Sequence, residues 1–241
     1  MDYGDLGALM NSASEQTKAH PLAGIDLVVL DFDGTLADTR GDIITGVNLA
    51  LEDLGLPCRP GPEISGFIGR GVENLARQCL PPEREDLLPK MLERFRERYR
   101  ECFDRTSRPY TGVADGLLRL HRRGLTLAIA SNKPTFYIDR LLETFGLDRL
   151  FIVVLGGDTM KRKKPDPWCI EHICRRSGVP QEKTLMVGDM RYDIETGVNA
   201  GIRTCGVRYG YGTAEELIRA GAHTLVQEFP ALVDRLVQCP S

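Results

Sequence analysis

One stretch decides how the rest of this chain is interpreted: Leu27-Val28-Val29-Leu30-Asp31-Phe32-Asp33-Gly34-Thr35-Leu36-Ala37-Asp38-Thr39. The aliphatic run from Leu27 to Leu30 predicts a strand that is buried on both faces. Side chains two residues apart in an extended chain point to the same side. We therefore expect Asp31 and Asp33 to leave the carboxyl end of this strand together.

Two carboxylates this close repel each other unless a cation or a proton lies between them. Mg²⁺ fits such a pair, because it binds one or two carboxylates and completes its shell with phosphate oxygen and water. Gly34 lets the backbone turn tightly, and the Thr35 hydroxyl can bind a ligand or cap a turn. The simpler interpretation is an Asp-Gly turn that ends a strand, and only matching residues downstream distinguish the two.

Composition limits the compartment and the partners. The 241 residues suffice for one large or two modest domains, and 42% hydrophobic with 27% charged residues is typical of a globular protein. A net charge of −3 gives no basic field, so we expect neither nucleic acid nor a membrane as partner. Seven cysteines, an odd number, do not suggest a disulfide framework, and we expect reduced thiols. No apolar run approaches the roughly 18 residues of a membrane span, and no signal peptide is evident, which predicts a cytoplasmic protein.

The periodicity of the apolar residues divides the chain into three parts. Residues 1–21 are small and polar, and predict a loose N-terminal tail. Residues 40–108 carry apolar side chains at helical spacing, with no strand, and predict an all-helical inserted cap. Residues 22–39 and 109–241 predict an α/β catalytic core.

The core shows a regular alternation of strands and helices. After the opening strand we expect strands at 125–130, 151–155, 185–187 and 205–207, and helices at 113–124, 136–145, 168–176, 194–200, 214–220 and 231–237. Such alternation predicts right-handed crossovers and a doubly wound parallel sheet, a Rossmann-like core. Ligands of such sheets bind beyond the carboxyl ends of the strands. Asp31 with Asp33, Ser131 and Asp189 follow three of those ends, so we expect them to converge.

Each later motif also has a plainer interpretation. Ser131 and Asn132 precede a helix, where a hydroxyl and free N–H groups suit an anion but also make an ordinary N-cap. Lys164 ends a basic run, and such runs are usually exposed to solvent. The Pro-Asp-Pro that follows could instead fix the direction in which the Lys164 side chain leaves the loop. Asp189 and Asp193 share a helix face, or simply stabilise the start of that helix.

Taken together, these segments resemble the haloacid dehalogenase superfamily of phosphohydrolases. The string DFDGTLADT resembles its first motif. The segments around Ser131, Lys164 and Asp189 resemble the second, third and fourth motifs, in the right order, so that the resemblance spans residues 25 to about 201. It implies Mg²⁺-dependent hydrolysis of a small phosphate monoester through an aspartyl-phosphate intermediate.

The resemblance also implies a role for each motif residue. Asp31 would be the nucleophile and Asp33 the general acid/base, and this second Asp argues against a dehalogenase. Mg²⁺ would be held by Asp31, the backbone carbonyl of Asp33, and Asp189. Asp193 would support these ligands without binding the ion directly. The phosphate-binding residues would be Gly34, Thr35, Ser131, Asn132 and Lys164.

Within the superfamily the chain most resembles the phosphoglycolate phosphatases, which implies 2-phosphoglycolate as substrate. The likeness also rests on the turn at 69–72 and the segment 109–113. The guanidinium group of Arg70 in that turn suits bidentate binding of a carboxylate or a distal phosphate of the substrate. The alternative is that Arg70 is simply a surface charge. The alternatives are a phosphatase of another small or larger ester or of pyrophosphate, a phosphomutase of the same fold, and a non-enzymatic binding module. In each enzymatic case we expect a small phosphorylated metabolite as partner, and a monomer or homodimer.

Overall fold

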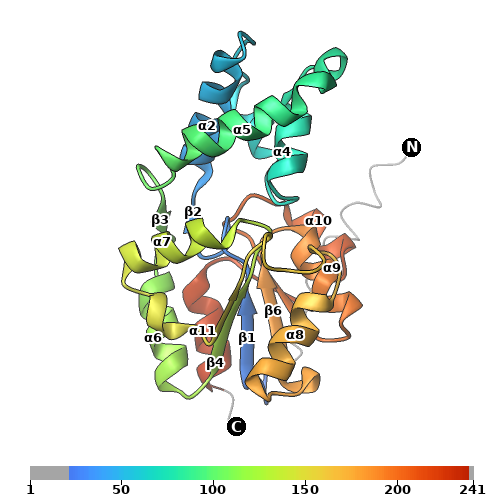
Figure 1. Ribbon diagram of the computed structural model, residues 1–241. Coiled ribbons are helices and arrows are strands. Elements are labelled where there is room, and N and C mark those ends of the chain that lie inside the picture. Colours follow the sequence, from blue (N-terminus) through green and yellow to red (C-terminus); the bar gives the residue numbers. More distant parts are fainter. Residues whose placement is uncertain (1–21, 239–241) are drawn as a thin grey trace, which may run out of the picture.

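The computed structural model describes residues 22–238 and places one parallel sheet at the centre of that part of the chain (Figure 1). In space its strands follow the order β5, β4, β1, β6, β7, β8. Their bounds are Leu27–Leu30 (β1), Thr126–Ala130 (β4), Val153–Leu155 (β5), Thr184–Gly188 (β6), Arg203–Val207 (β7) and Thr224–Val226 (β8). Leu30 of β1 lies opposite Ile129 of β4 and Val187 of β6, so these three strands end at the same level.

Helices cover both faces of this sheet. Their bounds are Val113–Arg122 (α6), Thr135–Phe145 (α7), Trp168–Ser177 (α8), Arg191–Asn199 (α9), Ala214–Arg219 (α10) and Phe229–Gln238 (α11), with short 3₁₀ helices at Asp148–Leu150 and Gln181–Lys183. Successive side chains of β1 point to opposite faces of the sheet. Val28 and Leu30 pack in one cluster with α6, α7 and α11, whereas Leu27 and Val29 pack with α8. The strand is therefore buried throughout.

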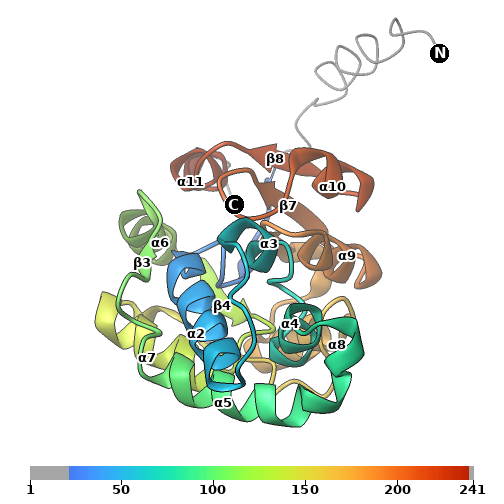
Figure 2. The ribbon, with the colours of Figure 1, turned by 90° about the horizontal axis from the view of Figure 1, so that it is seen from above.

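A helical cap lies above the carboxyl ends of the central strands (Figure 1). It contains α2 (Arg40–Asp53), α3 (Gly61–Ser65), α4 (Val72–Cys79) and α5 (Leu88–Arg100), with a 3₁₀ helix at Pro82–Leu87. Viewed from above, α2 and α5 lie side by side over the sheet (Figure 2), and they pack against each other. Val47, Met91 and Phe95 belong to an apolar cluster of the cap that is separate from those of the sheet.

The chain passes between core and cap at two neighbouring points. Strands β2 (Ala37–Asp38) and β3 (Arg108–Pro109) pair antiparallel there, and the predicted boundaries at 40 and 108 fall beside this ribbon. Next to it Asp42, buried at the start of α2, accepts hydrogen bonds of 2.7–3.0 Å from backbone and hydroxyl groups of Thr106 and Ser107. These four donors attach the first turn of α2 to the returning linker.

The predicted fold class, a doubly wound parallel sheet with an inserted helical cap, is confirmed. Several short elements lack a counterpart in the sequence analysis: the strands β2, β3 and β8, the helix α3 and the 3₁₀ helices. Each is too short to show a clear apolar period of its own. The predicted tail, residues 1–21, lies outside the described residues. Within residues 22–238 no helix has both the length and the apolar character that crossing a membrane requires.

Candidate active site

Three strand ends bring the predicted polar residues to one edge of the sheet. Asp31 follows β1, Ser131 follows β4, and Asp189 follows β6. The Asp31 backbone N–H donates to the Val187 carbonyl at 2.9 Å, so the ladder continues one residue past the strand. Since β1 is parallel to both neighbours, the three side chains emerge at the same edge, below the cap.

Asp31, Asp189 and Asp193 form a cluster of buried carboxylates, each with an oxygen within 4.8 Å of the others. Lys164 comes from a distant loop and joins them: its Nζ lies 2.9 Å from Asp31 and 2.5 Å from Asp193. Lys164 is only 5% exposed. The second Asp193 oxygen accepts a hydrogen bond from the Met190 N–H at 2.9 Å, which holds this carboxylate at the start of α9.

The charges of this cluster are unbalanced, because one ammonium group faces three carboxylates. Burial raises the pKa of Asp189 well above its ordinary value, and the charges of Asp193 and Asp31 raise it further. Burial and Asp31 also raise the pKa of Asp193 to about 6, against the opposing effect of Lys164. Burial alone would lower the pKa of Lys164, but the charges of Asp193 and Asp31 outweigh it and raise this pKa. A divalent cation with a preference for oxygen ligands, such as Mg²⁺, fits this excess of negative charge.

Gly34 and Thr35 both lie against Asp189. Gly34 has a φ of 84°, and a Cβ at this position would lie 2.2 Å from Asp189 Oδ2. The Thr35 hydroxyl donates to Asp189 Oδ1 at 2.8 Å. Both residues therefore position this carboxylate in the structure, and their predicted contact with phosphate stays a prediction.

Asn132 joins the cap to the loop that carries Lys164. Its Nδ2 donates to the Gly69 carbonyl of the cap at 2.8 Å, and its Oδ1 accepts from the Lys164 N–H at 3.1 Å. Ser131 is buried and lines the same pocket as Asp31. The predicted phosphate-binding residues thus come together, although both ends of the Asn132 amide already have protein partners.

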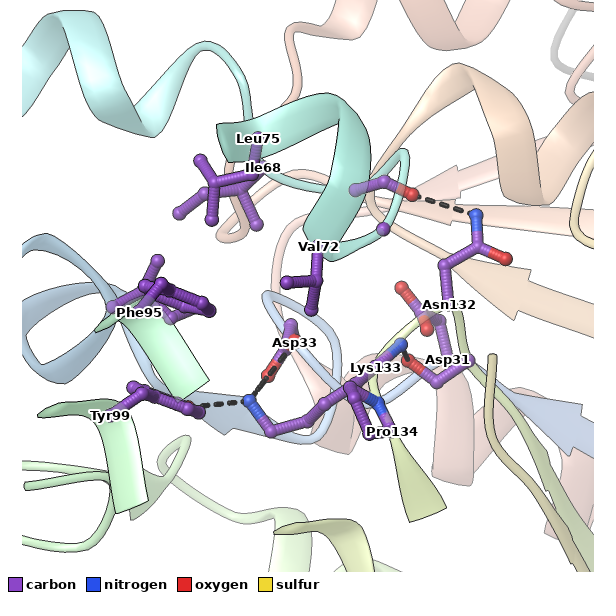
Figure 3. Close-up of a pocket in the computed structure, with 14 residues that line it drawn as sticks. Asp31, Asp33, Ile68, Val72, Leu75, Phe95, Tyr99, Asn132, Lys133 and Pro134 are labelled. Carbon is purple, nitrogen blue, oxygen red and sulfur yellow. Dashed lines mark hydrogen bonds and ion pairs between the residues drawn. The ribbon is translucent and has the colours of Figure 1, made fainter. Parts of the chain in front are cut away.

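A small cavity of about 50 Å³ lies between the core residues Asp31 and Asp33 and the cap (Figure 3). Lys133, for which the sequence suggested no role, points into it. The Lys133 Nζ lies 3.0 Å from Asp33 Oδ1 and 2.6 Å from the hydroxyl of Tyr99 on α5. Thr39 donates to the same Asp33 oxygen at 2.6 Å. The sequence did carry one signal, a cation directly after the Ser-Asn pair at a strand end.

Arg70 is not among the residues that line this cavity. Its guanidinium group lies 4.9 Å from the ring centroid of Tyr192, and its Nε donates to the Tyr192 hydroxyl. The flanking Gly69 and Gly71 line the cavity instead. The structure therefore does not bring the predicted substrate-binding Arg70 together with Asp31, and it places Arg70 at a contact between cap and core.

A loop after β7 also contributes to the site, although the sequence analysis did not predict it. The Tyr211 N–H donates to Asp189 Oδ2 at 2.7 Å, and its hydroxyl accepts from the Thr39 N–H at 2.9 Å. A Cβ at Gly210 would lie 2.2 Å from the Asp189 Cβ, so the loop approaches that residue as closely as a glycine allows. The sequence signal was the Gly210-Tyr211-Gly212 segment two residues after β7, and only the packing shows that it contacts Asp189.

Comparison with known proteins agrees with this geometry. The family model described as haloacid dehalogenase-like hydrolase matches residues 28–207. A phosphoglycolate phosphatase (plasmid) of Cupriavidus necator is 37% identical over 210 residues, which cover 85% of this chain and 90% of that protein. A phosphoglycolate phosphatase of Aliivibrio fischeri is 34% identical over 216 residues, which cover 87% of this chain and 95% of that protein.

A solved structure shares the fold over nearly the whole described chain. It is described as that of a predicted phosphoglycolate phosphatase from Haemophilus somnus, with a TM-score of 0.82 and 28% sequence identity. The match covers 88% of this chain and 97% of that one.

Proposed function

The chain belongs to the haloacid dehalogenase-like hydrolases and is a phosphoric monoester hydrolase, and from this premise we propose that it hydrolyses 2-phosphoglycolate with Mg²⁺ as cofactor. The proposed intermediate is an aspartyl-phosphate on Asp31. The substrate is inferred from the curated relatives, which are named phosphoglycolate phosphatases. The chemistry is inferred from the site itself.

One observation carries the chemical part of this proposal. A buried Lys164 contacts both Asp31 and Asp193, and Asp189 lies in the same cluster. A carboxylate that attacks a phosphate dianion meets like-charge repulsion, so catalysis depends on neutralisation and alignment. Lys164 supplies one positive charge beside the attacking oxygen. Asp31 and Asp189, with the backbone carbonyl of Asp33, would hold Mg²⁺, which supplies further neutralisation of the phosphate oxygens when bound.

The remaining residues act on protons and position. Asp31 would attack phosphorus, and the bond to the ester oxygen would break as that oxygen takes a proton from Asp33. Asp33 would then take a proton from the water that hydrolyses the aspartyl-phosphate. Thr39 and Lys133 hold the Asp33 carboxylate by hydrogen bonds of 2.6 and 3.3 Å, which keeps it at the cap side of the cavity. Ser131 would donate to a phosphate oxygen from the end of β4.

The test is phosphate release by the purified chain from 2-phosphoglycolate, with and without Mg²⁺ after treatment with a chelator. Asp31→Asn removes the nucleophile and should abolish release. Asp26→Asn, an exposed aspartate at the other end of the same strand, is the matched control and should retain activity. Undiminished turnover by Asp31→Asn would reject the mechanism.

A panel of other esters tests the substrate. Faster release from pyrophosphate or from a larger ester would replace 2-phosphoglycolate as the substrate. Interconversion of hexose 1- and 6-phosphates without release of phosphate would indicate a phosphomutase. The cytoplasmic location and the monomeric or homodimeric state stay predictions, which fractionation of cells and light scattering would test.

A further inference from the structure

We propose that Lys133 and Tyr99 form the subsite for the second anionic group of the substrate, a carboxylate two bonds from the ester oxygen. This inference rests on the proposed function and identifies the residues that would select the substrate. It assigns to Lys133 a contact with substrate, in addition to its contact with Asp33.

The Lys133 ammonium group lies between Asp33 and Tyr99, whereas Asp31 and Asn132 lie on the other side of Asp33 (Figure 3). Lys133 is 6% exposed, and its ammonium group contacts Asp33 and Tyr99 but is not paired with Asp31. The cap walls around it are mostly apolar, with Ile68, Val72 and Phe95 among them. A ligand that reaches this end of the cavity therefore meets one ammonium and one hydroxyl group in apolar surroundings, where a charge-assisted hydrogen bond is strong.

The ammonium group of Lys133 also has a hydrogen-bond donor that these two contacts do not use. A lysine ammonium group carries three N–H donors. Within the described residues, Asp33 and the Tyr99 hydroxyl take two of them. The rings of Tyr99 and Tyr137 lie with their centroids 4.9 and 5.9 Å from the Nζ, and they stabilise the cation without taking a donor. The third donor is available to a ligand in the cavity.

The chemistry of the ester places the carboxylate next to this donor. In 2-phosphoglycolate a single CH₂ group separates the ester oxygen from the carboxylate. Asp33 must reach that ester oxygen in order to protonate it, so the carboxylate must lie within a few ångströms of Asp33. Lys133 Nζ, at 3.0 Å from Asp33, is the cation in that position.

The surroundings of Lys133 lead to the same assignment. Its ammonium group is buried, and among the described residues Asp33 is the carboxylate with which it forms an ion pair. A substrate carboxylate in the cavity would give the third donor of Lys133 a charged acceptor, whereas an ester with a neutral tail would leave that donor without one. The site should therefore select esters that carry a second negative charge.

The experiment compares kcat/KM for 2-phosphoglycolate with kcat/KM for ethyl phosphate, which has the same length but no carboxylate. Using the ratio cancels any effect of a substitution on Asp33 that is common to both esters. Lys133→Met should lower the ratio about 10- to 100-fold, mainly through a higher KM for 2-phosphoglycolate. Lys133→Arg should restore part of it, and Tyr99→Phe should lower it a few-fold. Lys161→Met, an exposed lysine of the basic run, is the control and should keep the ratio of the unmodified chain.

The outcomes separate the inference from the proposed function. If the unmodified chain shows no preference for 2-phosphoglycolate over ethyl phosphate, the proposed substrate is wrong. If it shows the preference and Lys133→Met keeps it, or loses activity equally on both esters, the subsite is refuted and Lys133 acts only through Asp33. Should Lys133→Met fail to fold, Lys133→Gln takes its place, and an unchanged ratio in both Lys133→Gln and Tyr99→Phe refutes the subsite. Pyrophosphate is assayed in parallel, because a preference for it that Lys133→Met abolishes would mean that the subsite takes a second phosphate.

Discussion

Replacing Gly34 by alanine should damage the site far more than it damages the fold. The φ of 84° costs a residue with a Cβ about 1–2 kcal/mol of stability. The new Cβ would also lie 2.2 Å from Asp189 Oδ2, although real Cβ contacts are essentially never closer than 3.0 Å. Asp189 is fully buried, so relief requires this carboxylate to move by about 1 Å, and a misplacement of that size costs on the order of 100-fold in rate.

Gly124→Ala is the matched control. Gly124 has a φ of 87° and no atom within 4 Å of the place its Cβ would occupy, so it shares the backbone cost without the collision. Both variants should lose about 1–2 kcal/mol of unfolding free energy from the backbone in a urea titration. Only Gly34→Ala should lose about 100-fold in kcat/KM and require more Mg²⁺ for half-maximal activity. Equal activity of the two variants would show that the close approach of Gly34 to Asp189 does not hold the site in place.

Two other predictions concern the buried carboxylates. Burial and Asp31 raise the pKa of Asp193 from 3.8 to about 6. In the chelator-treated protein, the stabilisation that this shift provides is therefore fully present below pH 3.8 and is lost as the pH rises through about 6. Mg²⁺ should therefore raise the Tm more at about pH 7.5 than at about pH 5, and an equal rise would contradict the ligand set. Asp42→Ala should cost about 2–4 kcal/mol in urea unfolding, because it removes the acceptor of four donors beside the cap linker. The exposed Asp104→Ala should change stability by less than about 0.5 kcal/mol, and similar losses in both variants would refute the role of Asp42.

The sequence alone determined the architecture and the meeting place of the main charged groups. The run Leu27–Leu30 is apolar throughout, as a strand covered on both faces must be, and β1 is buried at every residue. Parallel strands place their carboxyl ends at one edge, so Asp31 and Asp189 could be expected together although they lie far apart in the chain. The prediction failed at β8, where only Leu225 and Val226 are apolar, whereas β5 lies in the continuous apolar run of residues 151–155.

Only the tertiary structure decided which groups contact each other within that site. Lys133 reaches Asp33, 100 residues earlier, and the hydroxyl of Tyr99 on a cap helix. Arg70 stands in a turn that does reach the cavity, yet its side chain stacks on Tyr192 outside it. The spacing of the apolar residues indicates which face of a helix or strand is buried. The partner of a side chain depends instead on how the cap docks on the core, and the packing of many distant residues sets that docking.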